Sequence, residues 1–531
     1  MEVDARTLPD HARIETDVCI VGAGAAGITL AREFGGQPFR VCLLESGGPR
    51  ADHATQALYQ GELSGHPGFP LDETRATGFG GSTSQWHGSC RPLDDVDFQV
   101  RDWVPFSGWP FPRSHLEPFY VRAQAVCQIG PFTYDARDWA DATSPSLPLR
   151  PGRVDTHIVQ ISRPARFGTI YRSAIRHAPN ITTLFYGSAV SLETTDDARL
   201  ATHLRVATLQ GKGFTIAARV FILAAGGIET PRLLLLSRTR RPTGLGNDHD
   251  LVGRFFMDHL RLEFGELRLA DPARYSRLYS VHHARRLGRR TKIEGFLAIG
   301  DGLAAQEGLV RCAVQIPPRW RARPEFHSEG TMALEQLVRA IGRGATPYKW
   351  DKRLRTVLAH LDDVAVTAFW RLVEALDAKK RLVTTTYVEQ IPNPDSRVTL
   401  AATRDALGRP RVRLDWRLSA IELRTIRRAN EILADELRMA GAGTLALPRG
   451  DNGRYPPQSL RGGYHHMGTT RMHPDPAQGV VDAACRLHGV ANVFVAGSAT
   501  FPTGGYAHPT LTIVALALRL ADHVRAQMAA T

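Results

Sequence analysis

The chain has 531 residues, of which 43% are hydrophobic and 22% are charged, a composition typical of a folded soluble protein. Because this length exceeds what one hydrophobic core usually serves, we expect two closely joined domains. The net charge of +13 is compatible with an anionic partner, but Lys and Arg form no run of five or six, so a generally basic protein is favoured over a nucleic-acid binder.

Residues 1–17 lack the apolar stretch of a secretory signal, and no apolar run has the length of a transmembrane helix. The cytoplasm is therefore the expected location. The six cysteines lie far apart and form no CxxC pair, so neither a metal site nor a disulfide framework is expected. Cys19 and Cys42 lie in apolar runs and are expected to be buried thiols.

The first strong pattern in the chain is that of a dinucleotide-binding β-α-β unit, TDVCIVGAGAAGITLAREF followed by FRVCLLESGG. Glycines spaced as G-x-G-x-x-G allow a tight turn and a close approach of the backbone to pyrophosphate, and the helix N-terminus faces the phosphates. The acid at the end of the second strand is expected to accept hydrogen bonds from the adenosine ribose. The alternative is a glycine turn that only packs a helix on a sheet. The expected cofactor-binding residues of this unit are Gly22, Gly24, Ala25, Ala26, Gly27, Glu45 and Ser46.

Two later segments predict further strands of the same domain. Residues 220–223 form an apolar run that leads through AAGG into a helix, and NVFVAGSATFPT contains another strand near the C-terminus. Strands from three distant regions would then complete one nucleotide-binding domain. The position of the β-α-β unit and these later strands favour FAD over NAD.

Residues 263–459 predict a different architecture. DSRVTLAATRDALGRPRVRLDW has the pattern of two strands around a turn at Gly408, and SAIELRTIRRANEILADELRMAG is an amphipathic helix that ends at Gly441. We therefore expect an antiparallel sheet with helices, inserted into the nucleotide domain. Residues 321–385 are rich in Arg and Lys at helical spacing, which favours a solvated helical face over a lid or entrance lining.

Several stretches, in order along the chain, resemble the glucose–methanol–choline (GMC) oxidoreductases, a family of FAD enzymes. Besides the N-terminal unit they are GFGGSTSQWHGSCRPLDDVDF (78–98), SGWPF (107–111), GNDHDLVGRFFMDH (246–259), HHMGTTRM (465–472) and VFVAGSATFPTGGYAHPTLTIVALALRLAD (493–522). Residues 265–385 match no segment of the family. The sequence is most similar to the sugar- and glycoside-oxidising bacterial-type branch.

The resemblance implies an α/β plus α+β fold, with a Rossmann-like FAD-binding domain and an inserted substrate domain built on an antiparallel sheet with helices. The expected FAD domain is discontinuous and comprises residues 1–262 and 460–531, with cap-like loops around 60–150. The substrate domain would then comprise residues 263–459.

In the family, the segment that resembles 78–98 runs along the flavin. One member carries a histidine directly before the tryptophan and bonds it covalently to the flavin. Gln85 takes that place here, before Trp86, so non-covalent FAD is expected, and His87, one residue away, is the alternative link. The cofactor residues that the resemblance implies in this segment are Gly80, Gly81, Ser82, Gln85, Trp86, His87 and Gly88.

Later segments add further expected cofactor contacts. Val190 resembles the position whose backbone pairs with adenine, although a plain strand residue is equally compatible with the pattern. Many flavoproteins place an acid after the glycine of AGSATFP to hold the ribityl chain, and here that residue is Ser498. The final helix begins near Pro509 and is apolar up to Arg519, so it is expected to be buried with its positive end beside the flavin. The expected residues are Val190, Ala225, Gly226, Gly497, Ser498, His508, Pro509 and Thr510.

The resemblance also implies a catalytic pair. The family's catalytic histidine follows an aromatic residue and corresponds to His465, and its partner, His or Asn, corresponds to His508. An imidazole suits the removal of a hydroxyl proton because it is neutral and basic near pH 7. His508 is expected to bond the substrate oxygen or to share the proton. His466 should point to the opposite side of the extended segment. The alternative is that these are core or surface histidines without a catalytic role.

The expected function is the FAD-dependent oxidation of an alcohol C–OH of a sugar, glycoside, polyol or related compound to a carbonyl. The hydride would pass to flavin N5, and the electron acceptor is O2 or another redox carrier. Two alternatives remain open at this point, a flavin monooxygenase and a non-redox lyase of the same fold.

Overall fold

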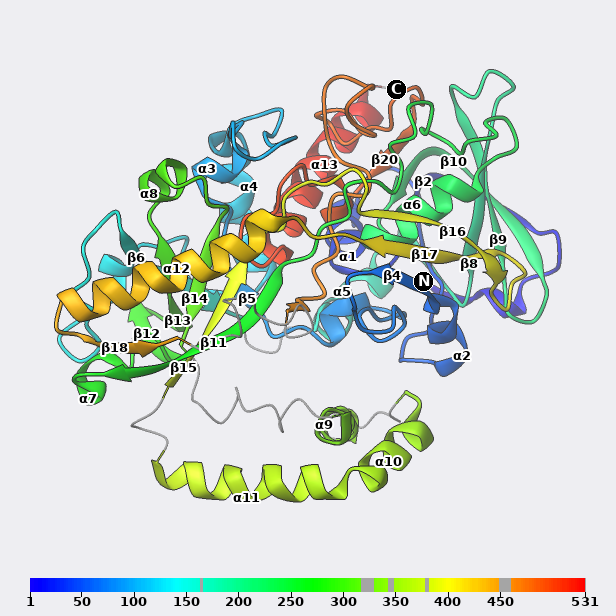
Figure 1. Cartoon of the computed structure of the whole chain (residues 1–531). Coiled ribbons are helices and arrows are strands. Elements are labelled where there is room, and N and C mark those ends of the chain that lie inside the picture. The colour runs from blue at the N-terminus through cyan, green and yellow to red at the C-terminus, as the bar shows by residue number, and fades with distance from the viewer. Residues whose placement is uncertain (163–165, 317–328, 342–347, 378–381, 448–459, 531) are drawn as a thin grey trace.

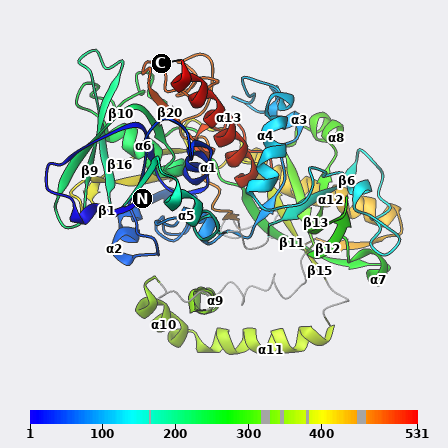
Figure 2. The ribbon, with the colours of Figure 1, turned by 180° about the vertical axis from the view of Figure 1, so that it is seen from behind.

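The computed structural model describes residues 1–530 except 163–165, 317–328, 342–347, 378–381 and 448–459. Within the described residues the strands form two large sheets and a small one, which lie side by side with helices packed on their faces (Figure 1). Figure 2 shows the same arrangement from behind, with α9 (Glu329–Ile341), α10 (Trp350–Ala359) and α11 (Leu361–Asp377) set apart below both large sheets.

The first large sheet is the predicted nucleotide-binding sheet. Its central strands and the strand that precedes the C-terminal helix are parallel, whereas the two strands at one edge are antiparallel to their neighbours. Strands from three distant regions therefore meet in one sheet, as predicted. Its order is β1 (Glu2–Asp4), β7 (Ile181–Phe185), β3 (Val41–Glu45), β2 (Arg13–Val21), β10 (Gly213–Leu223), β9 (Ala201–Ala207) and β8 (Ser188–Thr194), with β20 (Val493–Val495) on β10.

Four long helices accompany this sheet: α1 (Ala25–Phe34), α4 (Arg113–Val126), α5 (Phe167–His177) and α6 (Gly226–Leu236). The C-terminal helix α13 (Thr510–Ala529) packs against α1 and α4 and is buried along most of its length, as its apolar sequence predicts. The sequence predicts Pro509 at the first helical position, and this prediction is wrong by one residue. Pro509 is the N-cap residue, and its carbonyl accepts from Ile513 N at 2.8 Å, so the helix begins one residue later.

The second large sheet is antiparallel throughout its described pairs. Helix α12 (Ala420–Met439) covers one face of it; a capping box of Ser419 and Glu422 starts this helix, and Gly441, at φ 61°, follows its end as predicted. The strand order is β18 (Gly443–Ala446), β11 (Leu260–Leu269), β15 (Leu382–Val388), β14 (Cys312–Gln315), β13 (Arg289–Ile299), β6 (Val154–Ile161) and β5 (Ser89–Cys90), with β12 (His282–Arg286) on β13 and β19 (Arg461–Gly462) on β11.

The predicted hairpin forms as β16 (Arg397–Arg404) and β17 (Pro410–Trp416). The prediction that it belongs to the large antiparallel sheet is wrong. β17 pairs in parallel with β4 (Gly61–Gly65), and this three-stranded sheet lies against α6. The reason is a buried charge, because Arg232 of α6 donates to Asp405 at 2.6 Å and to the carbonyl of Pro410 at 2.9 Å. The large sheet, in turn, takes β5 and β6 from residues before 263.

The helical spacing of residues 321–385 appears as α9 (Glu329–Ile341), α10 (Trp350–Ala359) and α11 (Leu361–Asp377), and the rest of that region lies outside the described residues. We call these three helices the helical unit. Tyr348 and Lys349 attach it to the rest of the chain, since both donate to Asp72 at 2.7 Å. The remaining described α-helices are short: α2 (His53–Gln56), α3 (Asp95–Phe98), α7 (Pro272–Tyr275) and α8 (Asp301–Gln306).

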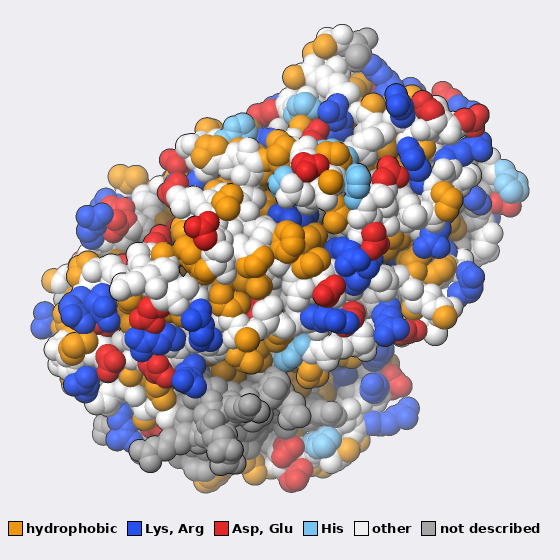
Figure 3. Space-filling model, turned by 45° about the horizontal axis from the view of Figure 1, so that its top comes forward, with side chains coloured by type: hydrophobic (Ala, Val, Ile, Leu, Met, Phe, Trp, Pro, Cys, Tyr) orange, Lys and Arg blue, Asp and Glu red, His pale blue; other side chains and the backbone are white. Residues whose placement is uncertain are grey.

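All six cysteines are buried free thiols, and Cys19 and Cys42 lie opposite each other on β2 and β3, as their apolar runs predict. None of the described helices has the length and hydropathy needed to cross a membrane. On the face shown in Figure 3, Lys and Arg side chains are interspersed with Asp and Glu rather than gathered into one field.

Candidate functional site

The G-x-G-x-x-G turn lies at the carboxyl end of β2 and packs tightly on its inner side. A Cβ atom on Gly22 would lie 2.7 Å from the carbonyl oxygen of Ala224, and one on Gly27 would lie 1.9 Å from that of Gly22. Gly22 also adopts a φ of 104°, which only glycine adopts without strain. These two positions therefore require glycine, because the turn closes on the neighbouring strand and on its own helix.

The segment predicted to follow the flavin lies directly against this turn. Gly80 N donates to the carbonyl oxygen of Ala23 at 2.8 Å, and a Cβ atom on Gly81 would lie 3.0 Å from the Cα of Gly24. Both Gly80 and Gly81 have positive φ values. Two segments that are far apart in the sequence are thus joined by backbone contact.

Glu45, the predicted ribose acceptor, joins three parts of this site through its carboxylate. It accepts from the backbone N–H groups of Ala23, Gly47 and Gly78 at 2.9, 2.8 and 2.9 Å. A carboxylate offers about four acceptor positions, so one remains for a ribose hydroxyl. Its contact with the ribose stays a prediction.

The residues present fit an extended dinucleotide such as FAD. Gly24, Gly226 and Gly497 follow the carboxyl ends of the adjacent strands β2, β10 and β20, and no atom lies within 4 Å of a Cβ placed on any of them. This glycine-lined opening lies where open α/β sheets bind their ligands, beside the free N–H groups that begin α1.

The other predicted cofactor residues differ in burial and in their contacts. Val190 is skipped in the pairing of β8 with β9, so its backbone lies on an irregularity of the strand. Trp86 packs edge-on against Phe167. Ser82, Gln85 and His87 are exposed. The half-buried residues are Ala25, Ser46, Ala225 and Thr510, and the buried ones are Ala26, Gly88 and Pro509.

Ser498 makes a bond that its sequence position did not indicate. Its hydroxyl donates to the carbonyl oxygen of His466 at 2.7 Å. Its single hydroxyl proton is thereby engaged, so Ser498 could donate to a ribityl oxygen only in a different side-chain rotamer. In the described conformation Ser498 fixes the histidine segment instead.

The structure brings His465 and His508 together, although 43 residues separate them. Their rings lie 5.0 Å apart, centroid to centroid, in an edge-to-face arrangement. His466 contacts a different neighbour, since its ring lies 5.6 Å from that of Phe256. The two adjacent histidines therefore face different surroundings, as their alternation predicts.

A third histidine, His259, completes a row with these two. Its Nδ1 lies 2.9 Å from Nδ1 of His465, and its Nε2 lies 3.3 Å from the carbonyl oxygen of Gly504. His259 is 1% exposed and directly precedes β11. The row begins at the carbonyl oxygen of Gly504 and continues through His259 and His465 to His508.

Asp258 holds the backbone beside this row. Its carboxylate accepts from the N–H groups of Gly463, Tyr464 and His465 at 3.2, 3.1 and 2.7 Å. Tyr464 adopts a φ of 63°, a strained conformation for a residue with a side chain. Burial raises the pKa of Asp258 to about 7, although the three backbone donors oppose that rise.

A buried ion pair supports the other end of the row. Arg101 and Glu389 form two hydrogen bonds of 2.7 Å and are 3% and 0% exposed, and Glu389 also accepts from Gly505 N at 3.3 Å. Tyr506 bonds the Nδ1 of His157 in the same region. The segment that presents Gly504 and His508 is thereby fixed on both sides.

Burial keeps the row of histidines neutral. It lowers the pKa of His465 well below its ordinary value, and the neighbouring His508 and His259 add to that effect. Burial likewise lowers the pKa of His508 to about 3 and that of His259 to about 4. At neutral pH each ring therefore has one protonated nitrogen and one nitrogen with a lone pair. This is the form that a general base requires.

Sequence reasoning did not assign a role to Asp258, His259 or Glu389. The first two end the quoted segment GNDHDLVGRFFMDH, so a signal was present in the resemblance, but no local pattern connected them with His465. Glu389 follows a strand of the second sheet and carried no signal of its own.

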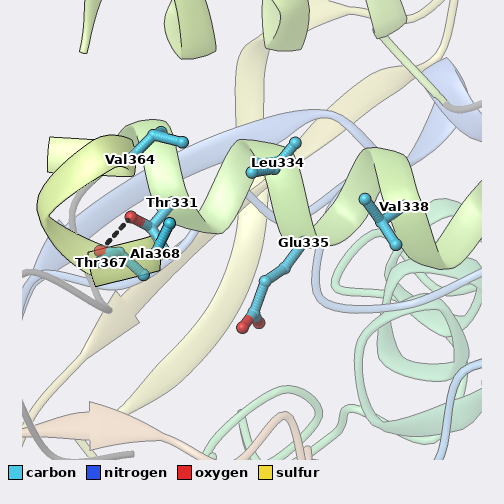
Figure 4. A pocket seen from close by; sticks show the side chains of 7 residues that line it. All are labelled: Thr331, Leu334, Glu335, Val338, Val364, Thr367 and Ala368. Atoms are coloured by element: carbon cyan, nitrogen blue, oxygen red, sulfur yellow. Dashed lines mark hydrogen bonds between the residues drawn. The ribbon is translucent and has the colours of Figure 1, made fainter. Parts of the chain in front are cut away.

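A separate cavity of about 430 Å³ lies between α9 and α11 (Figure 4). Thr331 and Thr367 meet across the two helices with a hydrogen bond of 3.1 Å, and Glu335 is the titratable residue of the lining. None of the residues predicted for the cofactor or the chemistry lines it. The cavity belongs to the helical unit rather than to the histidine site.

The chain matches one protein-family model over part of its length and several known proteins over nearly all of it. A family model described as GMC oxidoreductase matches residues 392–517. The fructose dehydrogenase large subunit of Gluconobacter japonicus is 24% identical over 96% of this chain and 98% of its own length. A 2-methyl-1,2-propanediol dehydrogenase of Mycolicibacterium austroafricanum is 24% identical over 96% and 95%, and the 6'''-hydroxyparomomycin C oxidase of Streptomyces lividus is 25% identical over 97% and 93%.

Solved structures show the same fold at low sequence identity. A formate oxidase is similar with a TM-score of 0.57 and 17% identity, over 98% of this chain and 99% of its own. A pyridoxine 4-oxidase from Mesorbium loti is similar with a TM-score of 0.52 and 17% identity, over 96% and 98%. The expected α/β nucleotide domain joined to an antiparallel-sheet domain is therefore confirmed.

Proposed function

The chain is a GMC oxidoreductase, an FAD-dependent enzyme acting on CH–OH groups, and from this premise we propose that it oxidises a sugar, glycoside or polyol with His465 as the base. FAD, when bound, supplies the acceptor for the hydride that leaves the alcohol carbon. The observation that carries the proposal is the row of three neutral histidines beside the glycine-lined opening.

In this proposal the two histidines have different roles. His465 accepts the hydroxyl proton, because its Nδ1 is engaged with His259 and its other ring nitrogen remains for the substrate. His508 lies 5.0 Å from His465 between rings and orients the substrate oxygen by a hydrogen bond. Holding the hydroxyl between two fixed imidazoles limits its orientation, which is a large part of what such a site contributes to rate.

The face of the second sheet that leads away from His508 supports a polyhydroxylated substrate. The ring of Tyr387 lies 5.6 Å from that of His508, its hydroxyl donates to Gln315 at 3.4 Å, and Gln315 donates to Glu294 at 2.8 Å. Residues on the opposite face, such as Thr386, contact α12. Polar side chains in a row suit a ligand with several hydroxyl groups.

The names of the relatives support the same class. A fructose dehydrogenase, a 2-methyl-1,2-propanediol dehydrogenase and a C-glycoside 3-oxidase of Microbacterium trichothecenolyticum are among the similar proteins. Both oxidases and dehydrogenases occur among them, so O2 and another redox carrier both remain candidate acceptors. The cytoplasmic location stays a prediction of the sequence.

An anaerobic screen of sugars, glycosides and polyols for bleaching of the flavin absorbance tests the proposal. We expect bleaching by at least one of these alcohols and no bleaching by NADPH alone. Bleaching by NADPH without an alcohol would favour a monooxygenase, and turnover without any change in flavin absorbance would favour a lyase. Admission of air then separates the acceptors, since slow return of the absorbance excludes an oxidase.

Non-covalent binding of the cofactor is a further part of the proposal. Gln85 stands where a covalent relative has histidine, and His87 is exposed. Acid precipitation of the loaded protein should release all flavin into the supernatant. Flavin that remains in the pellet of the natural protein but not of His87→Ala would show that His87 forms a link.

A further inference from the structure

We propose that His259 is a positioning residue that holds His465 in the tautomer protonated at Nδ1, which leaves the lone pair of His465 Nε2 for the substrate hydroxyl. The inference rests on the proposed function, because it takes His465 to be the base. It assigns a role to a histidine that lies 206 residues from the base and directly beside it in space.

The direction of each hydrogen bond follows from one atom that can only accept. The carbonyl oxygen of Gly504 has no proton, so the Nε2 of His259, at 3.3 Å, must be the protonated nitrogen. In a neutral imidazole the other nitrogen then carries a lone pair. His259 Nδ1 is therefore an acceptor, and the group that faces it at 2.9 Å, Nδ1 of His465, must donate.

The opposite tautomer of His465 has no partner in this arrangement. It would place two lone pairs against each other at 2.9 Å, and the buried His259 Nδ1 would lose its donor. An unsatisfied buried polar atom costs about 1–3 kcal/mol, enough to favour the Nδ1–H tautomer by one to two orders of magnitude. The geometry thus selects one tautomer of the base.

The anchor of this relay is itself fixed. Thr503 donates to the carbonyl of Asp97 at 2.7 Å, and Gly505 N donates to Glu389, so the peptide that carries the Gly504 carbonyl is held on both sides. On the other side, Asp258 accepts from His465 N at 2.7 Å and fixes the backbone of the base. Neighbouring residues Asp258 and His259 thus hold the backbone and the ring of His465, respectively.

Protonation states agree with this direction at neutral pH. Burial lowers the pKa of His259 to about 4, against the carbonyl of Gly504 and the charge of Glu389, which act to raise it. The groups that face His465 are His508, His259, His466 and His87, and all of them lower its pKa. His259 therefore stays neutral, and its acceptor nitrogen stays available.

The same bond assists the proton transfer itself. The substrate proton passes to Nε2 of His465, while the Nδ1 proton stays in place and donates to His259 throughout. Once His465 is an imidazolium, that bond has a charged donor and becomes stronger. His259 neither gains nor loses a proton in this step, so its role is to position and stabilise rather than to react.

The test compares three versions of the full, FAD-loaded protein: natural, His259→Leu and His259→Asn. Leucine removes the acceptor, whereas the amide oxygen of asparagine can take the place of His259 Nδ1. The direct readout is the ¹⁵N chemical shift of the two ring nitrogens of His465 in histidine-labelled protein, assigned by comparison with His465→Gln. The second readout is the pH profile of kcat and KM for the best alcohol from the screen.

In the natural protein we expect a protonated Nδ1 and a bare Nε2 on His465 between pH 6 and 8. His259→Leu should shift His465 towards the tautomer protonated at Nε2 and lower kcat by about ten- to a hundredfold with little change in KM, in line with the cost of about 1–3 kcal/mol for an unsatisfied buried polar atom. His259→Asn should restore about tenfold or more of that loss. His66→Leu is the control, since the half-buried His66 resembles His259 in having Nε2 3.0 Å from a backbone carbonyl but does not contact His465, and it should keep both readouts.

A protonated Nε2 on His465 in the natural protein would overturn the proposal, as would an unchanged tautomer and kcat in His259→Leu. Should His259→Leu fail to fold, the spectrum of the natural protein and of His259→Asn still decides the question. Activity that survives in His465→Ala would refute the proposed base, and the spectra would then test the positioning separately. If His465→Ala loses activity and His259→Leu keeps the natural activity, the positioning role is refuted and the proposed base is not.

Discussion

The carboxylate of Glu45 connects three segments that would each contact a different part of a bound dinucleotide. Its three donors come from the phosphate-binding turn, from the turn after β3 and from the segment that begins at Gly78. Glu45 therefore acts on the shape of the site itself, besides its predicted contact with a ribose. This dual role has a consequence that can be measured without the cofactor.

Replacing Glu45 by Gln is expected to destabilise the FAD-free protein. An amide nitrogen cannot accept a hydrogen bond, so the backbone N–H groups that face it stay buried without an acceptor. This costs about 1–3 kcal/mol. Chemical denaturation of the FAD-free protein measures this loss. The exposed Glu15→Gln serves as control and should change the free energy of unfolding by about 0.5 kcal/mol or less. An unchanged stability of Glu45→Gln, with weaker FAD binding, would show that Glu45 acts through the ribose alone.

The sequence predicted the glycines from their spacing and the pair His465 and His508 from the family resemblance, and the structure brings the two histidines together. The sequence did not predict the partner of His465, because His259 ends a segment that carries the resemblance but no local pattern that connects it with His465. Its role depends on a contact across 206 residues, which exists only once β11 and the 462–466 segment pair beside each other. Spacing along the chain contains no record of such a contact.

A buried carboxylate, that of Asp72, contributes to the attachment of the helical unit to the rest of the chain. Asp72 is 4% exposed and accepts from Tyr348 and Lys349, which directly precede α10. Burial alone would raise the pKa of Asp72, but these two donors lower it below its ordinary value. Arg461 extends towards the same unit, with a contact to Met332 of α9 at 3.6 Å.

The double variant Tyr348→Phe and Lys349→Met should loosen α10. It leaves Asp72 buried without its donors, and breaking a buried pair in this way costs about 3–5 kcal/mol. Amide hydrogen exchange of residues 350–359 should accelerate by at least about tenfold, while α12 keeps its protection. Lys352→Met, on an exposed position of the same helix, should leave the exchange unchanged. Equal exchange in all three proteins would show that other contacts hold the unit.

The elements themselves were predicted more reliably than their neighbours. The period-2 pattern around Gly408 specified the hairpin β16–β17, since strand alternation is a local property. It did not specify the sheet that receives the hairpin, because that depends on the buried bonds of Arg232 to Asp405 and Pro410 and on pairing with β4. The arrangement of elements is decided by contacts between distant segments.

Over the whole molecule, the neutral histidines couple stability to pH. His259 titrates near 6.5 in the unfolded chain but near 4 when folded, so the unfolded state binds more protons between these values. Its contribution to the free energy of unfolding is complete above pH 6.5 and is lost as the pH falls towards 4. The buried acids Asp97 and Asp258, whose pKa values are raised to about 7, act in the opposite direction.

A comparison with His259→Asn isolates the contribution of this histidine from those of the acids. The difference in unfolding free energy between the natural protein and the variant should shrink by about 1.4 kcal/mol per pH unit as the pH falls from 6 to 5. Chemical denaturation at matched FAD concentration over pH 5 to 8 measures it. Parallel curves for the two proteins would mean that His259 is not held neutral by the fold.

The measurement that tests the central claim most directly is the anaerobic rate of flavin bleaching by the best alcohol in His465→Ala. We expect the variant to bind FAD normally and to bleach more slowly by on the order of 10²- to 10⁴-fold, as for loss of a general base. His466→Ala, its neighbour in the chain, should stay within about tenfold of the natural rate because its ring faces Phe256. Bleaching of His465→Ala at the natural rate would contradict the account, since the proton would then leave by another route.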